Sequence, residues 1–355
     1  FDQFGAPAPV GSGLVIQPVG LDVLDRLGAG SQARALGTPI LRLLGHEADR
    51  GRPVLDVRYA GRAGLGIHRA ALFEALLQQV TQRGIPLRTG ARVTGRSGQH
   101  LQFEGRERAA PADLIVDACG AGSPLSPLTA RALPYGAIWG TVDWPRQTRL
   151  PQDRLSQRYR KASRMVGVLP IGRVPGHDGP KAAVFWSLPA TRHADWHAGG
   201  LQAWRAEAEA LWPDVAPFLA QITSPEQMTM ARYGHGTLAR PWGEGIVHIG
   251  DAAHRASPQL GQGANMALLD AMGLALALRQ HPLRDAPARL CPWPALARLD
   301  LSGDVGRLHP HSTSRTAAGC PCCATGCSIR SAGCHRSPPP SATWCRAPCC
   351  PHMAH

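Results

Sequence analysis

The sequence from Gly245 to Leu278, GIVHIGDAAHRASPQLGQGANMALLDAMGLALAL, changes its hydrophobic pattern twice. The apolar run at 245–249 predicts a short buried strand, and the run from Met266 predicts a helix. Between them stand an acid followed by two alanines, then a proline, with glycines at 250, 261 and 263, an order that predicts a sharp turn. Glycines at 261 and 263 let backbone approach a bound molecule without interference from a Cβ atom. The stretch therefore predicts a strand, a turn and a helix, with a ligand against the turn.

The turn offers two kinds of group to such a ligand. Asp251 directly follows the strand and can accept hydrogen bonds from the hydroxyls of a ribose or polyol. The helix that begins near Gly263 presents free N–H groups and a positive dipole end, which favour anionic or electron-rich groups. Glycine-rich turns are also common in α/β proteins without a ligand, so only the length of the pattern favours a binding site. His254 is interpreted as a loop residue, since no second ligand stands at metal spacing in that turn.

The whole stretch resembles the second FAD-binding motif of the single-component flavin-dependent aromatic hydroxylases. This class A family includes para-hydroxybenzoate hydroxylase and the ubiquinone-biosynthesis hydroxylases. The resemblance implies that Asp251 binds the ribityl chain and that Pro258 lines the isoalloxazine. It also implies that the flavin pyrimidine edge contacts a run of turn residues, namely Gly261, Gln262, Gly263, Ala264 and Asn265. The helix dipole would then stabilise negative charge on the reduced flavin.

Two further regions carry the same resemblance. The run GIHRAALFEALLQQV at 66–80 resembles the helix whose arginine contacts the flavin, which implies that role for Arg69. The run ADLIVDACGAGSPL at 112–125 resembles the middle motif that touches FAD and NADPH, which implies a role for Gly120. Cys119 stands where that motif usually has an aspartate, so the carboxylate role there is in doubt. As a nucleophile Cys119 is a poor candidate, because no His or Asp partner is indicated nearby.

The first residues, FDQF, match the end of the family's second strand, which implies that Asp2 binds the adenosine ribose. In that family a first strand and a GxGxxG turn come earlier and hold the pyrophosphate. We expect about thirty such residues to be missing before Phe1, a length taken from the family's motif order. Gly11 and Gly13 are no substitute, because no strand precedes them and no phosphate-binding helix follows at the required spacing.

The order of predicted elements indicates an α/β protein with an incomplete Rossmann-like FAD-binding domain and an inserted, mostly antiparallel substrate sheet. Helices are predicted at 20–28 and 68–83, and a buried parallel strand at 112–120. Longer strands are predicted at 135–144, 163–172 and 181–189, with a helix at 201–212. The expected divisions are a first FAD-binding part at 1–130, a β-rich substrate domain at 131–235, a second FAD-binding part at 236–283, and an aberrant tail at 284–355.

The tail holds most of the cysteines, because Cys119 is the one cysteine before Cys291 among ten in the chain. Paired CxxC spacing is absent, which argues against a zinc site. A disulfide-rich module would be odd on a flavoenzyme with reduced thiols. If the coding sequence of the tail is read one base out of frame, each Cys-Cys pair gives a leucine. The resulting amino-acid sequences resemble the C-terminal region of the ubiquinone-type hydroxylases. We therefore favour a frameshift between about Asp285 and His309, and we expect a poorly packed tail.

The net charge of +13 comes from scattered arginines, with Lys161 and Lys181 the only lysines. No basic block with interleaved aromatic residues is present, so a nucleic-acid partner is not expected. No run of eighteen apolar residues occurs, so no transmembrane span is predicted. The first 290 residues contain one cysteine, which fits a cytoplasmic enzyme whose thiols stay reduced. Its substrate is expected to be a small molecule.

The resemblance implies an FAD-dependent monooxygenase that uses NADPH or NADH and O2 to hydroxylate an aromatic or similar small organic substrate. The alternatives are another FAD-dependent oxidoreductase of this fold, such as a reductase or halogenase, and a non-catalytic remnant. No catalytic base is named. Tyr233 and His235 either face the substrate cavity or lie in a surface loop, and the second interpretation is slightly favoured. The aromatic residues of the expected substrate sheet include Trp139, Phe185 and Trp186.

Overall fold

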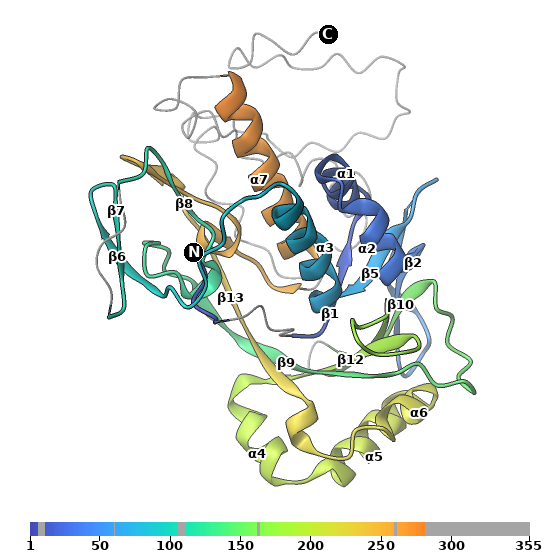
Figure 1. The fold of residues 1–355 in the computed structure, drawn as a ribbon. Helices are drawn as coiled ribbons and strands as arrows, with labels where there is room; N and C mark the ends of the chain where they lie inside the picture. Colours follow the sequence, from blue (N-terminus) through green and yellow to red (C-terminus); the bar gives the residue numbers. More distant parts are fainter. Residues whose placement is uncertain (6–10, 60, 106–110, 162–163, 259–260, 281–355) are drawn as a thin grey trace, which may run out of the picture. The chain divides into compact units, whose positions relative to one another are not determined.

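The computed structural model describes residues 1–5, 11–59, 61–105, 111–161, 164–258 and 261–280. Within that part, several sheets and helices from distant stretches of sequence pack together, so the mixed α/β class is confirmed (Figure 1). The predicted tail at 284–355, with its cysteine cluster and the suspected frameshift, lies outside the described residues. No helix in the described part has both the length and the apolar composition needed to cross a bilayer.

The largest sheet has eight strands in the order β16-β13-β9-β12-β11-β10-β3-β4. All neighbouring strands are antiparallel except β3 and β10. The three long strands predicted from sequence are confirmed as β9, β11 and β12. The bounds are β3 Arg42–Glu47, β4 Pro53–Arg58, β9 Arg131–Asp143, β10 Arg154–Arg160, β11 Arg164–Gly172, β12 Lys181–Pro189, β13 Thr229–Thr237 and β16 His254–Arg255.

One face of this sheet, called here the helix-side face, is covered by α4 (His193–Ala198), α5 (Leu201–Leu211) and α6 (Ala216–Leu219) (Figure 1). In α5 the buried residues Trp204, Ala208 and Leu211 repeat at helical spacing, which points one stripe at the sheet. Alternate residues of the sheet strands pack against the helices. The residues of strands and helices form one buried cluster that includes Ile138, Val142, Val166, Val168, Val184, Trp186, Phe218, Leu219 and Ile222. The helix predicted at 201–212 is confirmed.

The opposite face, called here the β1-side face, is packed against a three-stranded sheet in the order β1-β5-β2. These strands are β1 Gly13–Ile16, β5 Gly64–His68 and β2 Thr38–Ile40. The two sheets approach closely, because a Cβ atom at Gly66 would lie 2.0 Å from the carbonyl oxygen of Pro170 in β11. Only glycine permits that approach. Sequence inspection did not single out residues 13–16 as a strand; they pair with β5, and their side chains are mostly buried.

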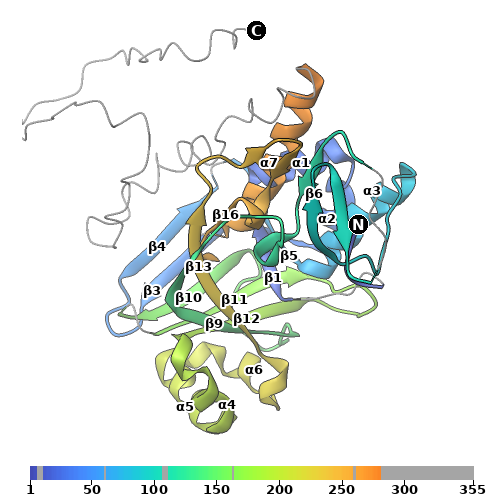
Figure 2. The same cartoon turned by 90° about the vertical axis from the view of Figure 1, so that its left-hand side faces the viewer.

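Four helices flank the small sheet: α1 Pro18–Leu27, α2 Gly30–Leu36, α3 Arg69–Gln82 and α7 Gln262–Gln280 (Figure 2). α1 begins with a proline in its first turn and ends at Gly28, whose φ of 79° is left-handed. α3 begins after His68, whose Nδ1 accepts a hydrogen bond from the N–H of Ala70 at 3.2 Å. The helices predicted at 20–28 and 68–83 are therefore confirmed to within a few residues.

A second three-stranded sheet has the order β14-β15-β8, from Trp242–Gly243, Ile246–His248 and Ile115–Asp117. β15 and β8 are parallel, as the buried runs ending in turns predicted. Short 3₁₀ turns follow both strands, η1 at Gly120–Gly122 and η5 at Gly250–Ala252. A separate hairpin comprises β6 (Val93–Ser97) and β7 (His100–Phe103). Further 3₁₀ turns are η2 Ala190–Arg192, η3 Pro213–Val215 and η4 Pro225–Gln227.

Candidate functional site

The carboxyl ends of the parallel strands β8 and β15 bring two predicted motifs together. The N–H of Ile249 donates to the carbonyl of Asp117 at 3.0 Å, and the Ser126 hydroxyl donates to the carbonyl of Ala252 at 2.5 Å. These bonds hold the turns η1 and η5 side by side, with Gly120 in one and Asp251, which is exposed, in the other. Ligands of α/β folds bind at the carboxyl ends of parallel strands.

A buried carboxylate fixes the start of η1. The side chain of Asp117 accepts hydrogen bonds from the Ser123 hydroxyl at 2.7 Å and the Cys119 N–H at 3.1 Å, and it contacts His248 Nδ1 at 2.7 Å. Burial alone would raise the pKa of the Asp117 carboxyl, but these partners outweigh it and hold the pKa below its usual value. Sequence inspection did not single out Asp117 or His248, because 131 positions separate them.

Cys119 lies in this turn, and its surroundings keep the thiol protonated. Cys119 is exposed, but desolvation by the surrounding protein, the neighbouring Asp117 carboxylate and, more weakly, Asp2 raise the pKa of its thiol to about 11. A thiol with that pKa is a poor nucleophile near neutral pH.

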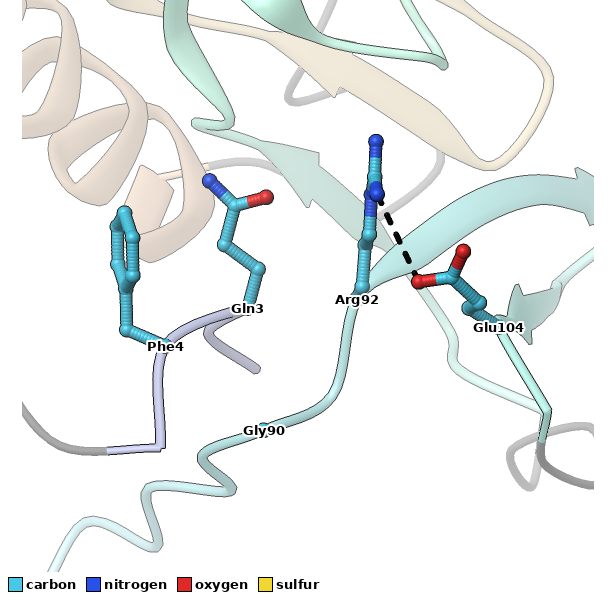
Figure 3. A pocket seen from close by; sticks show the side chains of 5 residues that line it. All are labelled: Gln3, Phe4, Gly90, Arg92 and Glu104. Atoms are coloured by element: carbon cyan, nitrogen blue, oxygen red, sulfur yellow. Dashed lines mark ion pairs between the residues drawn. The ribbon is translucent and has the colours of Figure 1, made fainter.

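The first residues do not form the strand end that the sequence suggested. Asp2 N–H donates to the Arg88 carbonyl at 2.8 Å, Ala91 N–H donates to the Asp2 carbonyl at 2.7 Å, and the Asp2 carboxylate accepts from the N–H of Phe4 at 2.8 Å. The segment is a bend lying along residues 88–91. Beside it is a hollow of about 440 Å³, over which an Arg92–Glu104 ion pair at 3.6 Å stands opposite Gln3 and Phe4 (Figure 3).

Asn265, in the first turn of α7, has its side chain fully used within the protein. Its Oδ1 accepts from the N–H of Gln17 at 2.8 Å, while its Nδ2 donates to the carbonyls of Val15 at 3.1 Å and Gly261 at 2.8 Å. The residue is 0% exposed. Its amide therefore clamps α7 to the end of β1, and any contact of Asn265 with a ligand would come from its backbone.

In the turn before α7, the backbone at Gly263 and the side-chain amide nitrogen of Gln262 are, among the described residues, without contacts that would occupy them. Gly261 has a φ of 63°, and its N–H donates to the carbonyl of Pro258 at 2.9 Å, with the Pro258 ring exposed. A Cβ atom at Gly263 would meet no protein atom within 4 Å, so open space lies against that backbone. The Nε2 atom of Gln262 is buried without a hydrogen-bond partner in the described part of the chain. Ala264 packs against the cluster beneath α1.

The interpretation of His254 as a loop residue is wrong. His254 is 5% exposed in the short strand β16, and its Nε2 contacts the Asp270 carboxylate on α7 at 2.6 Å. The same carboxylate oxygen accepts from the N–H of Gly250 at 2.8 Å. Asp270 thus ties the turn that carries Asp251 to the helix that carries Asn265. Within the described residues, no group of three His, Cys, Asp or Glu side chains could hold a metal ion.

Arg69 is the exposed first residue of α3, just after β5. Its N–H donates to the carbonyl of Ser12 at 3.2 Å, and a Cβ atom at Gly11 would lie 2.8 Å from the Arg69 side chain. The side chain of Arg69 therefore lies against Gly11, which precedes β1. This places Arg69 at the amino end of β1, whereas Asn265 binds the carboxyl end of that strand.

The aromatic residues expected in the substrate sheet divide between its two faces. Trp139 and Phe185 lie on the β1-side face with ring centroids 4.5 Å apart, whereas Trp186 belongs to the helix-side core. Tyr233 is half-buried, and its hydroxyl accepts from Trp139 Nε1 at 3.3 Å. Both residues lie in strand β13, so the favoured interpretation as surface-loop residues is wrong, although His235 is exposed.

The residues at this site fit FAD on structural grounds. Two carboxylates, the partly exposed Asp2 and the exposed Asp251, can accept hydrogen bonds from hydroxyl groups such as those of a ribose or a polyol chain. Open space borders the backbone at Gly120 and Gly263, and the α7 amino terminus presents N–H groups beside the unpartnered amide of Gln262. A flavin pyrimidine edge supplies both acceptors and donors to such a turn.

The sequence matches the family described as FAD binding domain over residues 2–290. The chain belongs to this family. Aurachin C monooxygenase/isomerase of Stigmatella aurantiaca is 28% identical over 325 residues, which cover 86% of this chain and 79% of that protein. FAD-dependent urate hydroxylase of Klebsiella pneumoniae is 23% identical over 303 residues, which cover 81% of this chain and 76% of that protein.

Solved structures share the fold. The tetrameric form of 2-methyl-3-hydroxypyridine-5-carboxylic acid oxygenase superposes with a TM-score of 0.70 at 21% identity, covering 86% of this chain and 83% of that one. The recognition of a class A flavin-dependent hydroxylase from the second motif is confirmed by the family match. FAD is accordingly the cofactor of this family member, and the prediction of an FAD-dependent oxidoreductase is confirmed.

Proposed function

We propose that the chain is an FAD-dependent monooxygenase that uses NADPH or NADH and O2 to hydroxylate an aromatic or similar small organic substrate. The observation that supports this most directly is the convergence of η1, η5 and the α7 amino terminus on one region next to the β1-side face of the large sheet. The named relatives, a monooxygenase/isomerase and a urate hydroxylase, act in the same chemical class.

In this proposal the protein binds and orients, while bound FAD supplies the redox chemistry with O2. Asp251 accepts hydrogen bonds from the ribityl hydroxyls, and Asp2 accepts them from the adenosine ribose. The peptide N–H groups of Gln262, Gly263 and Ala264 face the pyrimidine edge, with the α7 dipole favouring negative charge there. Pro258 lines the ring system, Gly120 lets the chain pass close to the cofactor, and Arg69 contacts the flavin from α3.

We propose a division of the chain that follows the same logic. Residues 1–130 and 236–283 would form the FAD-binding part, with a Rossmann-like core around β8 and β15. Residues 131–235 would form the substrate part. The strands β3 and β4, at 42–58, also join the large sheet, so the first part contributes to the substrate wall as well. A cytoplasmic location remains a prediction from the thiol usage.

The proposal is tested in two steps, first by measuring FAD retention and then by measuring turnover. The purified chain is reconstituted with FAD, passed through gel filtration, and assayed for flavin absorbance, then for NADPH oxidation and O2 consumption. We expect Gly263→Leu to fold normally, since open space receives the side chain, and to lose FAD by filling that space. Ala203→Leu on the exposed side of α5 is the matched control. Retention of FAD by Gly263→Leu at the wild-type level would contradict the assigned site.

A further inference from the structure

The β1-side face carries a buried acceptor that no group in the described part of the chain satisfies. Gln157 in β10 is 4% exposed, and its Oε1 atom has no hydrogen-bond partner. Its Nε2 reaches only the sulfur of Met165, at 3.5 Å. A buried carbonyl oxygen without a donor is unfavourable. A water molecule or a ligand can supply the missing donor to such an atom.

The neighbours of Gln157 across the sheet include two stacked aromatic rings, of which Phe185 is 3% exposed and Trp139 is half-exposed. In the sheet register Gln157 is paired with Gly167, Gly167 with Phe185, and Phe185 with Trp139. Because Gly167 has no side chain, the Phe185 ring lies over it; a Cβ atom there would be 2.0 Å from Phe185 Cζ. Phe185 and Trp139 stack at an interplanar angle of 24°. We call Gln157, Met165, Phe185 and Trp139 the aromatic shelf.

Met165 is the part of the aromatic shelf that can move. It is half-buried, and its unbranched thioether chain covers the Gln157 amide. Methionine adopts other rotamers at low cost and contacts aromatic rings favourably. A planar ring could therefore displace the Met165 side chain and reach Gln157 without backbone movement.

The charge on this face argues against an anionic ligand. Among the described residues in the paired rows through Gln157 and Tyr159, Glu47 is the one charged side chain, at the β3 edge beside Tyr159. Three of the cations on these strands are placed or paired elsewhere: Arg158 stacks on Trp212 on the helix-side face, Lys181 at the start of β12 pairs with Asp143, and Arg131 is the exposed first residue of β9. A carboxylate on the aromatic shelf would be desolvated with no cation to receive it.

We propose that the aromatic shelf binds the organic substrate as an uncharged planar aromatic ring that presents a hydrogen-bond donor, N–H or O–H, to Gln157 Oε1. This inference rests on the proposed function for calling the ligand a substrate, whereas the binding itself depends only on the sheet. Gln157 is then the residue that sets specificity for a donor group. The half-exposed Trp139 supplies the stacking surface, and the buried Phe185 packs against it and holds its ring in place.

Three probes with the same bicyclic ring system test the assignment by isothermal titration calorimetry, with and without FAD. 2-Quinolone is uncharged and has an N–H donor; N-methyl-2-quinolone lacks the donor; quinoline-2-carboxylate is an anion. We expect 2-quinolone to bind about tenfold more tightly than its N-methyl form, the effect of leaving one buried acceptor unpaired. The anion is expected to bind more weakly than both.

The variant Gln157→Leu separates recognition from folding. We expect it to bind 2-quinolone and N-methyl-2-quinolone equally, because the acceptor that distinguishes them is gone, with an unchanged circular dichroism spectrum. Gln202→Leu, at an exposed position of α5, is the matched control and should keep the tenfold preference. The assignment is overturned if no probe binds, if the anion binds best, or if Gln157→Leu keeps the preference. Loss of FAD binding or of NADPH oxidation, with the Gln157-dependent preference intact, would instead count against the proposed function alone.

Discussion

The two faces of the eight-stranded sheet are made by the same strands, yet they pack against the rest of the protein differently. On the helix-side face, side chains fill the space beneath α5 and α6, and Phe218, Leu219 and Ile222 are 0% exposed. On the β1-side face, contact is made partly by bare backbone, and a buried amide oxygen of Gln157 stays unsatisfied. One face is built for stability, and the other retains features that a ligand could complete.

Removing an aromatic ring from the helix-side face should have the largest effect on stability. Phe218 is fully buried and meets Trp144 edge-to-face with centroids 5.2 Å apart. Phe218→Ala is expected to lower the free energy of unfolding by about 3–5 kcal/mol, because a cavity replaces the ring. Urea denaturation followed by circular dichroism measures this. A loss below about 1 kcal/mol would mean that the helices can collapse onto the sheet, and the contrast between the faces would fail.

A methyl group at the close approach tests the other face. Gly66→Ala would place a Cβ atom 2.0 Å from the Pro170 carbonyl oxygen, which is backbone and cannot rotate away. We expect a loss of about 1–3 kcal/mol from forced separation of β5 and β11, measured by the same denaturation. Gly263→Ala is the control, because its Cβ atom would meet open space. Equal stability of Gly66→Ala and the control would contradict backbone contact between the sheets.

The two faces should also respond to opposite ends of the pH scale. On the helix-side face, burial and the neighbouring Arg158 lower the pKa of His46. A lowered folded-state pKa contributes stability that is present above the unfolded value of about 6.5 and is lost as pH falls through the folded value. Melting temperatures between pH 7.5 and 5 should therefore fall, and His46→Gln should reduce that fall. An identical decline in the variant would remove His46 from the explanation.

On the β1-side face, burial raises the pKa of Tyr59 and of Tyr159 to about 12. A raised folded-state pKa contributes stability that is present below the unfolded value of about 10 and is lost as pH rises through the folded value. These tyrosines therefore stay uncharged across the whole range in which His46 titrates.

The smallest effect is expected at the rim of the aromatic shelf. Tyr233→Phe removes the hydroxyl that accepts from Trp139 Nε1 at 3.3 Å, and Trp139 is half-exposed, so water can replace that partner. We expect a change in unfolding free energy of at most about 1 kcal/mol. Thermal melting by differential scanning calorimetry measures it. A larger loss would show that Tyr233 supports the fold rather than only lining the shelf.

Sequence inspection predicted the elements whose hydrophobic pattern is continuous. α1, α3, α7 and the long strands β9, β11 and β12 were found because each carries an unbroken period of 3.6 or a long apolar run. β3 and β4 were not expected, since arginines, a histidine and an aspartate interrupt them, and their place in the large sheet depends on pairing with β10, more than 100 positions away. β1 was missed because its four residues lie among glycines that read as a loop.

Some residues of the candidate site could likewise be predicted from the sequence, and others could not. Asp251, Gly261 and Gly263 could be identified because the second motif is contiguous in sequence. The groups that hold this motif in place, Asp117 with His248 and His254 with Asp270, could not, because no spacing rule links residues on separate elements. Asn265 was identified for contact with the flavin, whereas its side chain serves the protein. A motif match finds residues near a ligand without separating those that touch it from those that position others.

The clamp made by Asn265 has a consequence for the order in which the chain folds. Its partner Gln17 lies 248 positions earlier, so the end of β1 stays unfinished until almost all of the described sequence has been made. At a synthesis rate of about 5–20 residues per second, that interval is roughly 12–50 s on the ribosome. The antiparallel sheet and α5, whose partners are closer in sequence, can assemble during this time. The cofactor turn is then the last part to close, whereas β1 itself can pair with β5 long before Asn265 is made.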